Sequence, residues 1–381
     1  MWFIKVSSPH KVYFVSKVSD PQPAASYAQR YSINSDHIMM MKIDFNLIFV
    51  WILLTPIVCL FNCDKNDAPF EAQTFGPPDP PFLWEPVSNA SLIYAKSLVL
   101  NNKSYLYAAS GDGVHRSMNR GETWDKVFFN QTSLIEINPL NDDIFVPHGT
   151  SLKISSDDGD TWHSPINLPR LFITTLIFPE NGDIYAGCFQ TDEIRGGMYI
   201  SHDNGDTWTK SSSFVQDNHL VEMIITSLKN ILVSSATNQI YKSNDLGQSW
   251  RKVDNSGMGR AIYQFRLDSY GRIFAGTWGD GIHMSENEAE NWMYRGLRGH
   301  KIRDMVIDKE NTIIVVSNDE WSDENDGVYY STDFGIEWHR INENKPILNG
   351  LALVIDDEGY IYVCTAYEGI FRSSKPSSVL K

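Results

Sequence analysis

The sequence is poor in basic residues and has no run in which they gather. Its 381 residues include 32 Lys and Arg against 47 Asp and Glu, which gives a formal net charge of −15 at pH 7. This balance argues against nucleic acid as a partner and against electrostatic binding to anionic membranes. A locally basic pocket is still compatible with it.

Cysteine is also scarce, with four in the chain. Cys59 and Cys63 lie in the N-terminal targeting region, whereas Cys188 and Cys364 fall in predicted strands of different repeat units. A disulfide between the latter two would need their strands to be adjacent, and four units separate them. We therefore expect Cys188 and Cys364 to be small buried side chains without a disulfide.

Motifs of catalysis and cofactor binding are missing as well. We find no nucleophile triad, phosphate-binding loop or strong metal-ligand cluster. Residues 156–160 are acidic enough to suggest a calcium loop, but an EF-hand needs a late bidentate Glu, and here a Trp and a new strand follow instead. The sequence therefore predicts no metal and no cofactor.

What the sequence does have is one recurring octapeptide, Ser-x-Asp-x-Gly-x-(Thr/Ser)-Trp, written most fully at residues 201–208. Strict or looser copies begin at Ser117, Ser155, Ser243, Ser285 and Ser331, and a fading copy begins at Ser373. Successive first serines are 38, 46, 42, 42, 46 and 42 residues apart. A self-similar period in this range indicates a repeat architecture.

The octapeptide has the composition of a tight turn between two strands. Asp and Ser oxygens accept hydrogen bonds from nearby backbone N–H groups, and Gly supplies the positive φ that such a turn needs. The large apolar Trp is expected to pack beneath the turn and tie each unit to its core. We interpret these residues as structural.

Each unit has the layout of four short strands with Gly, Asn and Asp turns between them. The last unit lacks the Trp and the fourth strand, while Trp84 opens a segment that matches the fourth strands elsewhere. The sequence therefore predicts an all-β, seven-bladed β-propeller over residues 83–374. Its N-terminal strand would complete the last blade and close the ring, which removes exposed sheet edges.

The octapeptide resembles the Asp-box, or bacterial neuraminidase repeat, of sialidases, xyloglucanases, sortilin-type receptors and photosystem II assembly factors. The resemblance covers the whole repeat region and is specific for a β-propeller blade, but it does not choose among those functions. It implies Asp-box turns that join the third and fourth strands, on the face away from the usual binding site.

The N-terminal part carries targeting signals instead of repeats. Residues 1–40 are expected to be an unstructured or non-native extension, since three methionines at 39–41 precede a strongly apolar run. Residues 41–63 resemble a signal peptide or membrane anchor, with a possible lipidation site at Cys63. An uncleaved helical anchor is the alternative, and plain secretion the third. A Pro-rich linker follows at 64–82, and residues 375–381 form a tail. We expect an exported protein of the cell envelope, an outer-membrane or periplasmic lipoprotein.

Function is expected on the face opposite the Asp-box turns, where the loops between second and third strands and those between blades open. Aromatic faces beside polar groups suit sugars. The residues that we expect to contact a ligand are Trp278, Trp321, Tyr367, Asp192, Arg195, Arg298 and Arg303. The alternative is that the aromatic residues cover blade edges and the charged loops are merely solvated.

Two functions remain open at this stage. The resemblance allows a sialidase-like or xyloglucanase-like glycosidase, whose acid–base candidates are Asp280, Asp319 and Glu368. However, sialidases have six blades and an early Arg-Ile-Pro motif that is absent here, and xyloglucanases use a cleft between two propellers. We favour a monomeric, non-catalytic module that binds or assembles with a glycan or protein ligand, because its requirements, a rigid ring and variable loops, are visible.

Overall fold

The computed structural model describes residues 2–8, 11–16, 82–87, 92, 94–191, 196–212, 219–319, 322–341 and 349–380. The chain divides into two compact units, Met1–Gly76 and Pro77–Lys381. In the first, strand β1 (Trp2–Ser8) pairs antiparallel with β2 (Lys11–Ser16). This hairpin departs from the unstructured stretch that we expected at residues 1–40; it joins two β-branched and aromatic segments. Whether these residues belong to the mature protein stays a prediction.

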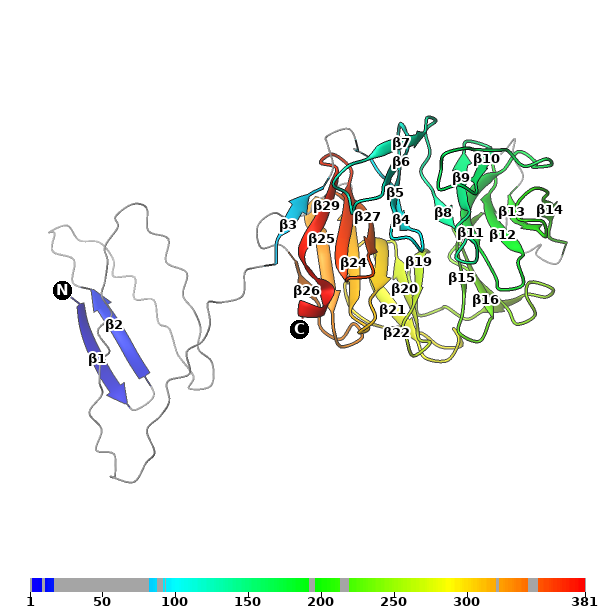
Figure 1. The fold of residues 1–381 in the computed structure, drawn as a ribbon. Helices are drawn as coiled ribbons and strands as arrows, with labels where there is room; N and C mark the ends of the chain where they lie inside the picture. Colours follow the sequence, from blue (N-terminus) through cyan, green and yellow to red (C-terminus); the bar gives the residue numbers. More distant parts are fainter. Residues whose placement is uncertain are drawn as a thin grey trace, which may run out of the picture. The chain divides into compact units, whose positions relative to one another are not determined.

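The second unit is a ring of seven antiparallel sheets, the blades of a β-propeller (Figure 1). The innermost strands are β4 (Ser97–Leu100), β8 (Glu136–Ile137), β11 (Phe172–Ile177), β15 (Leu220–Ile225), β19 (Ile262–Leu267), β23 (Ile302–Ile307) and β27 (Gly350–Ile355). The second strands are β5 (Leu106–Ser110), β9 (Ile144–His148), β12 (Ile184–Phe189), β16 (Ile231–Ser235), β20 (Ile273–Thr277), β24 (Ile313–Asp319) and β28 (Tyr360–Thr365). The predicted all-β, seven-bladed fold is confirmed.

The two outer strands of each blade flank the recurring octapeptide. The third strands are β6 (Gly113–Ser117), β10 (Ser151–Ser155), β13 (Gly197–Ser201), β17 (Ile240–Ser243), β21 (Ile282–Ser285), β25 (Ser322–Ser331) and β29 (Ile370–Pro376). The fourth strands are β7 (Asp125–Phe128), β14 (Thr209–Lys210), β18 (Arg251–Val253), β22 (Met293–Tyr294), β26 (His339–Arg340) and β3 (Trp84–Pro86). In the second blade, a single bridge between Ile154 and His163 stands in the fourth position.

The ring closes through the N-terminal strand, as the sequence predicts. Strand β3 pairs with β29, with Trp84 opposite Ser373. The Trp84 side chain is buried and its Nε1 donates to the Ile341 carbonyl of the sixth blade at 3.4 Å. Residues from both ends of the unit thus make one sheet and seal its core.

Apolar side chains fill the spaces between neighbouring blades. Phe274 and Met284 of the fifth blade, for example, share a buried cluster with Ile302 and Met305 of the sixth. Because side chains alternate in direction along a strand, these residues point out from the sheet faces, where only the next blade can cover them.

The two described cysteines behave as expected. Cys188 and Cys364 are fully buried free thiols, and burial raises the pKa of both. They act as small apolar side chains in the cores between blades.

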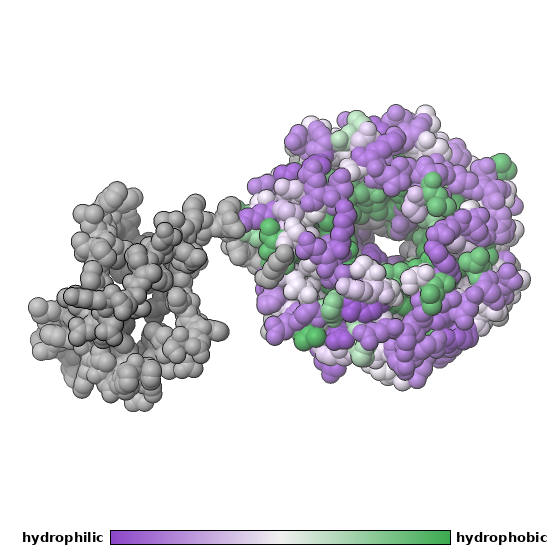
Figure 2. Space-filling model, turned by 60° about the horizontal axis from the view of Figure 1, so that its bottom comes forward, coloured by the Kyte–Doolittle hydropathy of each residue, from purple (hydrophilic) through white to green (hydrophobic). Residues whose placement is uncertain are grey.

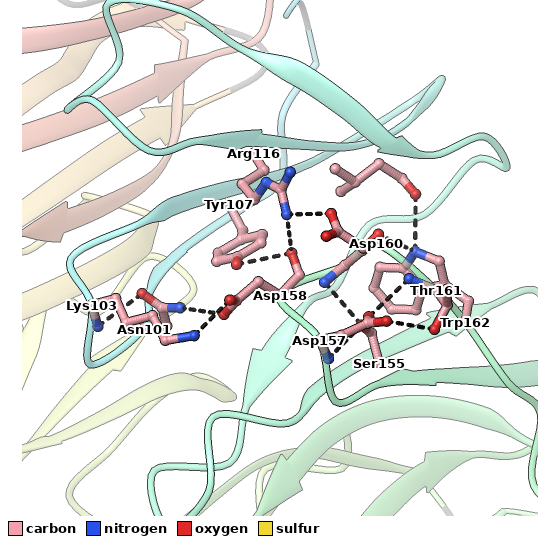
Figure 3. Close-up of polar contacts among 12 residues, drawn as sticks. Asn101, Lys103, Tyr107, Arg116, Ser155, Asp157, Asp158, Asp160, Thr161 and Trp162 are labelled. Atoms are coloured by element: carbon pink, nitrogen blue, oxygen red, sulfur yellow. Dashed lines mark hydrogen bonds and ion pairs between the residues drawn. The ribbon is translucent and has the colours of Figure 1, made fainter.

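The six octapeptides that begin at Ser117, Ser155, Ser201, Ser243, Ser285 and Ser331 each form a compact loop after the third strand of a blade, which we call the repeat turn; Figure 3 shows that of the second blade. In the second blade, Ser155 Oγ accepts the Gly159 N–H at 2.9 Å. Asp157 accepts the Thr161 N–H at 2.8 Å and the Thr161 hydroxyl at 2.6 Å, and these bonds lower its pKa to about 2. Gly159 has φ +97°, which confirms the predicted positive φ.

The residue before the turn glycine also has a positive φ and reaches back to the preceding blade. Asp158, with φ 59°, accepts from Lys103 Nζ at 2.6 Å and from Asn101 at 3.2 Å, while Arg116 binds its carbonyl at 2.9 Å (Figure 3). We call residues at this position clasp residues. The others are Arg120, Asn204, Leu246, Glu288 and Phe334.

The clasp residue and its contacts differ from blade to blade, whereas its positive φ is common to all of them. Glu288 accepts from the Thr226 hydroxyl at 2.6 Å and from Asn230 at 2.9 Å. Arg120 forms a bidentate pair with Glu358 across the closure between the seventh and first blades. The turn tryptophan adds a second link, since Trp162 Nε1 donates to the Val127 carbonyl of the first blade at 2.9 Å.

Residues 375–380, which we expected to leave the propeller as a tail, pack against it instead. Strand β29 runs to Pro376, and a 3₁₀ turn, η1 (Ser377–Val379), follows. Ser377 Oγ donates to Asp308 of the sixth blade at 2.6 Å, and Leu380 is buried in the core cluster of Trp84. The expectation was wrong because the apolar Leu380 comes too late to show as part of a repeat.

Within the described residues, no helix has the length and apolar character needed to cross a membrane. The predicted targeting segment at 41–63, with Cys63, and residues 64–81 of the predicted linker at 64–82 lie outside these residues.

The closure gives a direct stability prediction. Trp84→Ala should lower the free energy of unfolding by about 3–5 kcal/mol, because it removes a buried aromatic ring and leaves a cavity beside β29. Thermal unfolding followed by circular dichroism measures the effect. Glu85→Ala, an exposed change in the same strand, should shift the melting temperature little. An unchanged melting temperature in the Trp84 variant would show that the ring does not depend on this strand.

Candidate functional site

The innermost strands surround a central channel with a volume of about 1000 Å³. Figure 2 shows the hollow at the centre of the ring, with hydrophobic residues gathered around it. Because successive strands are antiparallel, every innermost strand starts at the face that carries the second-to-third loops, opposite the repeat turns. This end of the channel is its mouth.

A β-bulge at the same position in five innermost strands aims one extra residue at the channel. The register of β15, β19, β23 and β27 shifts after the first paired residue of each strand, and that of β11 shifts after its second. The residues inserted there, all of which line the channel, are Thr174, Val221, Tyr263, Arg303 and Leu351. Bulges commonly redirect side chains next to functional sites. The sequence analysis missed them because an inserted residue leaves the apolar pattern of a short strand nearly intact.

Two of the bulge residues belong to a group of aromatic and cationic side chains at the mouth. The Tyr263 and Trp278 rings lie 4.8 Å apart between centroids, tilted by 31°. The Arg303 guanidinium lies 4.2 Å from the centre of the Trp278 ring, and Lys301 Nζ lies 5.2 Å from it. We call Tyr263, Trp278, Lys301 and Arg303 the mouth cluster. Cation–π contacts of this kind hold a ring in one orientation.

The structure thus brings together Trp278 and Arg303, which the sequence analysis singled out separately. It adds Tyr263 and Lys301, which that analysis did not select. An isolated bridge between the backbones of Trp278 and Lys301 fixes the loop after β20 against the start of β23. The cluster therefore stands on two neighbouring blades with little freedom to move.

Asp280 and Arg298 lie nearby but are bound to structural partners. Asp280 accepts the Gly259 N–H at 3.0 Å, and its carboxylate lies 3.1 Å from His283 Nε2 and 3.8 Å from Arg298 Nε. Partial burial alone would raise the pKa of Asp280, but these partners outweigh it and lower the pKa below its usual value. Arg298 also lies over the Tyr294 ring at 4.9 Å. An ionised, fully engaged carboxylate is a poor proton donor.

Tyr367 and Glu368 lie on the seventh blade and are exposed. Tyr367 packs edge-to-face on Tyr94 at 5.1 Å, and within the described residues it has no ring contact with Trp278. Trp278 and Tyr367 stand on the fifth and seventh blades, with the sixth blade between them. Their expected role in contacting a ligand stays a prediction.

Several predicted residues lie outside what the structure describes. They are Asp192, Arg195 and Trp321. Asp319 is placed only as the last residue of β24, where it pairs with Ser322. Their roles stay predictions.

Deeper in the channel lies a group of charged residues that the sequence analysis did not select. Arg266 bridges two neighbouring blades, with Nη2 at 2.8 Å from Asp304 and Nη1 at 3.4 Å from Glu222. Asp304 also accepts the Leu353 N–H at 3.0 Å. Glu136, from the second blade, faces the same space. Each is a charged residue inside a short, otherwise mostly apolar strand, which is the signal that could have revealed them.

This deeper group holds three carboxyl groups and one guanidinium, and burial shifts the pKa values of all three carboxyl groups. Burial, reinforced by the charge of Glu222, raises the pKa of Glu136 to about 8. Burial raises the pKa of Glu222 to about 7 against the opposing pull of Arg266, and it also raises the pKa of Asp304. Near neutral pH, part of this group is therefore protonated.

No group of three or more His, Cys, Asp or Glu side chains suited to a metal ion occurs within the described ranges.

The raised pKa values predict a stability that depends on pH. The folded protein holds a proton on Glu136 up to about pH 8, whereas the ordinary pKa is 4.5, so stability falls as the pH rises between these values. Glu136→Gln should make the free energy of unfolding depend less on pH. Between pH 5 and pH 8 the variant should lose on the order of 2 kcal/mol less stability than wild type. Chemical unfolding at several pH values measures the slope, and Glu286→Gln, on an exposed turn, serves as the control. Equal slopes for wild type and Glu136→Gln would contradict the assignment.

Known proteins resemble the chain at modest identity. It is 26% identical over 193 residues to an oligoxyloglucan-reducing end-specific xyloglucanase of Emericella nidulans, a match that covers 46% of this chain and 24% of that protein. The chain spans only about a quarter of the length of the curated relatives that it matches.

Solved structures of other proteins share the fold, and two of them serve as examples. The extracellular domain of a putative hybrid two-component system from B. thetaiotaomicron superposes with a TM-score of 0.62 at 12% identity, over 76% of this chain and 39% of that one. YCF48 from Cyanidioschyzon merolae superposes with a TM-score of 0.57 at 14% identity, over 78% of this chain and 99% of that one. A family model described as the DUF6242 β-propeller domain matches residues 81–376.

Proposed function

The chain belongs to the DUF6242 β-propeller domain family, and we propose that it is an exported, non-catalytic module that binds a glycan at the mouth cluster. The observation that carries this proposal is the pairing of Tyr263 and Trp278 under two cationic side chains at the end of the channel. Aromatic faces stack on the C–H faces of sugars, and the flanking polar groups take the hydroxyls.

Binding fits this geometry better than catalysis does. A retaining or inverting glycosidase needs one carboxyl group that is protonated beside the scissile bond and a second at about 5–10 Å from it. Asp280, two residues after Trp278, is held ionised by its partners. The channel carboxyl groups whose pKa is raised lie beyond the mouth, in the wall of the ring. Glu222 and Asp304 are paired with Arg266, and Glu136 lines the channel.

Export and tethering are part of the same proposal. The apolar run at residues 45–61 and the possible lipidation site at Cys63 support it, as does the likeness in fold to an extracellular domain. The repeat turns have the hydrogen bonds that an Asp-box of the sialidase-type repeat requires, with Ser and Asp oxygens capping the turn. These bonds support the proposal that the chain is an Asp-box propeller.

The second candidate function is glycoside hydrolysis, which the similarity to a xyloglucanase favours. It would use carboxylates of the long loops, such as Asp319 and Asp192, together with Glu368. Incubation of the purified protein with xyloglucan and other polysaccharides, followed by mass spectrometry, separates the two functions. A product that disappears in Asp319→Ala or Glu368→Ala would make the chain a glycosidase.

The mouth cluster predicts the effect of two substitutions on binding. Trp278→Ala and Arg303→Ala should each weaken the affinity for an oligosaccharide by about tenfold or more, because the stacking ring or its cationic support is lost. Titration calorimetry measures the affinity, after circular dichroism has verified the fold. The control is Tyr270→Ala, which removes an exposed ring from the turn between β19 and β20 on the opposite face. Wild-type affinity in both cluster variants would place the ligand elsewhere.

A further inference from the structure

A second hollow, with a volume of about 490 Å³, opens on the same face where the seventh, first and second blades meet. Its lining residues are Tyr94, Lys96, Gly111, Asp112, Gln131, Thr132 and Ser133. Lys96 and Ser133 line the central channel as well, so the two hollows adjoin. We call the second hollow the tyrosine pocket.

Tyr94 lines the tyrosine pocket, and the exposed Tyr367 of the seventh blade packs against it. Tyr94 is 42% exposed and Tyr367 is 61% exposed, and their rings meet edge-to-face at an interplanar angle of 78°. A side-chain hydrogen bond to Tyr367 is the main reason that the pKa of Tyr94 is raised. Large aromatic surfaces are usually buried, and a pair left in water beside a pocket is typical of a binding surface.

The backbone holds this pair in an unusual conformation. Tyr94 has φ 59°, in the left-handed region that bulky residues seldom adopt. Its N–H donates to the carbonyl of Ala366, the neighbour of Tyr367, at 3.0 Å. The bond ties the entrance of the first blade to the loop of the seventh and fixes both rings before any ligand arrives. Strained residues that the surrounding structure holds in place are frequent at ligand sites.

The two charged side chains of the pocket, Asp112 and Lys96, differ in whether another side chain neutralises their charge. Asp112 accepts from Ser110 at 2.6 Å and is paired with His115 and Lys126, each at 3.0 Å, so its charge is already met. Lys96 is exposed, and within the part of the chain that the structure describes its ammonium group has no hydrogen-bond or ion-pair partner. The pocket therefore offers one positive charge beside two aromatic rings.

We infer that the tyrosine pocket binds a sugar residue that carries a carboxylate, in the same glycan that contacts the mouth cluster. The inference rests on the proposed glycan-binding function. The sugar ring stacks on the exposed face of Tyr367, its carboxylate pairs with Lys96, and its hydroxyls bond to the Gln131 and Ser133 side chains. A glycan that spans both hollows passes over Lys96 and Ser133, which border both. The shared chemistry is that of a uronic acid or a sialic acid.

A glycan fits this pocket better than an acidic peptide does. Two rings set nearly at right angles offer a flat face and an edge, and the remaining lining is short and polar. This combination suits a rigid ring with hydroxyls. An extended peptide would pair with an open sheet edge, and none of the lining residues of the pocket belongs to a strand.

The test measures binding of the purified full chain to matched acidic and neutral oligosaccharides by calorimetry. One pair is an oligogalacturonate and the same oligomer with its carboxyl groups reduced; the other is sialyllactose and lactose. Wild type should bind the acidic member of at least one pair about tenfold more tightly, since a charge-assisted bond is worth roughly that factor. The pair that shows the preference identifies the source of the carboxylate.

Variants then assign the preference to the pocket. Lys96→Met should abolish the acidic preference while leaving the affinity for the neutral member unchanged, and Tyr367→Ala should weaken both. Lys309→Met removes the same charge from the turn between β23 and β24 on the opposite face and should change nothing. An acidic preference that survives in Lys96→Met, or its absence in wild type, would overturn the inference.

The outcomes for Trp278→Ala separate this inference from the proposed function. If Trp278→Ala binds all sugars more weakly and wild type has no acidic preference, the proposed glycan binding at the mouth cluster is supported and the inference about the tyrosine pocket is wrong. An acidic preference that depends on Lys96, with wild-type affinity in Trp278→Ala, would keep the pocket and move the glycan away from the mouth. No binding of any sugar, or binding of an acidic peptide alone, would overturn both.

Discussion

The propeller depends on one contact made at nearly every joint, the clasp between a repeat turn and the blade before it. The Ser and Asp of the turn cap their own backbone, and Gly with a positive φ lets the chain reverse. That geometry forces the preceding residue into a positive φ as well and aims its side chain back across the gap, as at Asp158 and Glu288. Blades thus share hydrogen bonds and apolar cores, and the fit of each blade sets the position of the next.

The fold was predictable because its signal is repeated. Six tryptophan-ended turns and the unmatched segment at Trp84 determine the number of blades and the way that the ring closes. Local exceptions were not predictable: Leu380 packs beyond the last repeat, and the second blade keeps only one bridge in its fourth position. In both cases tertiary packing decides the structure, and the local pattern carries little information about it.

The site was predictable only in part. Trp278 and Arg303 were selected from their loops, but their stacking follows from a bulge that a sequence hardly reveals. Tyr367 was grouped with Trp278, whereas the ring places it beside Tyr94, which the sequence analysis did not consider. The charged residues of the channel come from four different blades, so no spacing along the chain links them. These residues come together at the centre only because the ring closes.

The closure by β3 also determines how the protein carries mechanical load. The chain before residue 82 is joined to the propeller through the outermost strand of one blade, which is held by a short antiparallel pairing with β29 and by the buried Trp84 ring. If the proposed N-terminal anchor held the protein while a partner pulled on the propeller, the tension would act first on that strand. If β3 separates from β29, one blade loses its fourth strand while the other six stay paired. We therefore expect β3 to be the first part of the ring to give way under tension.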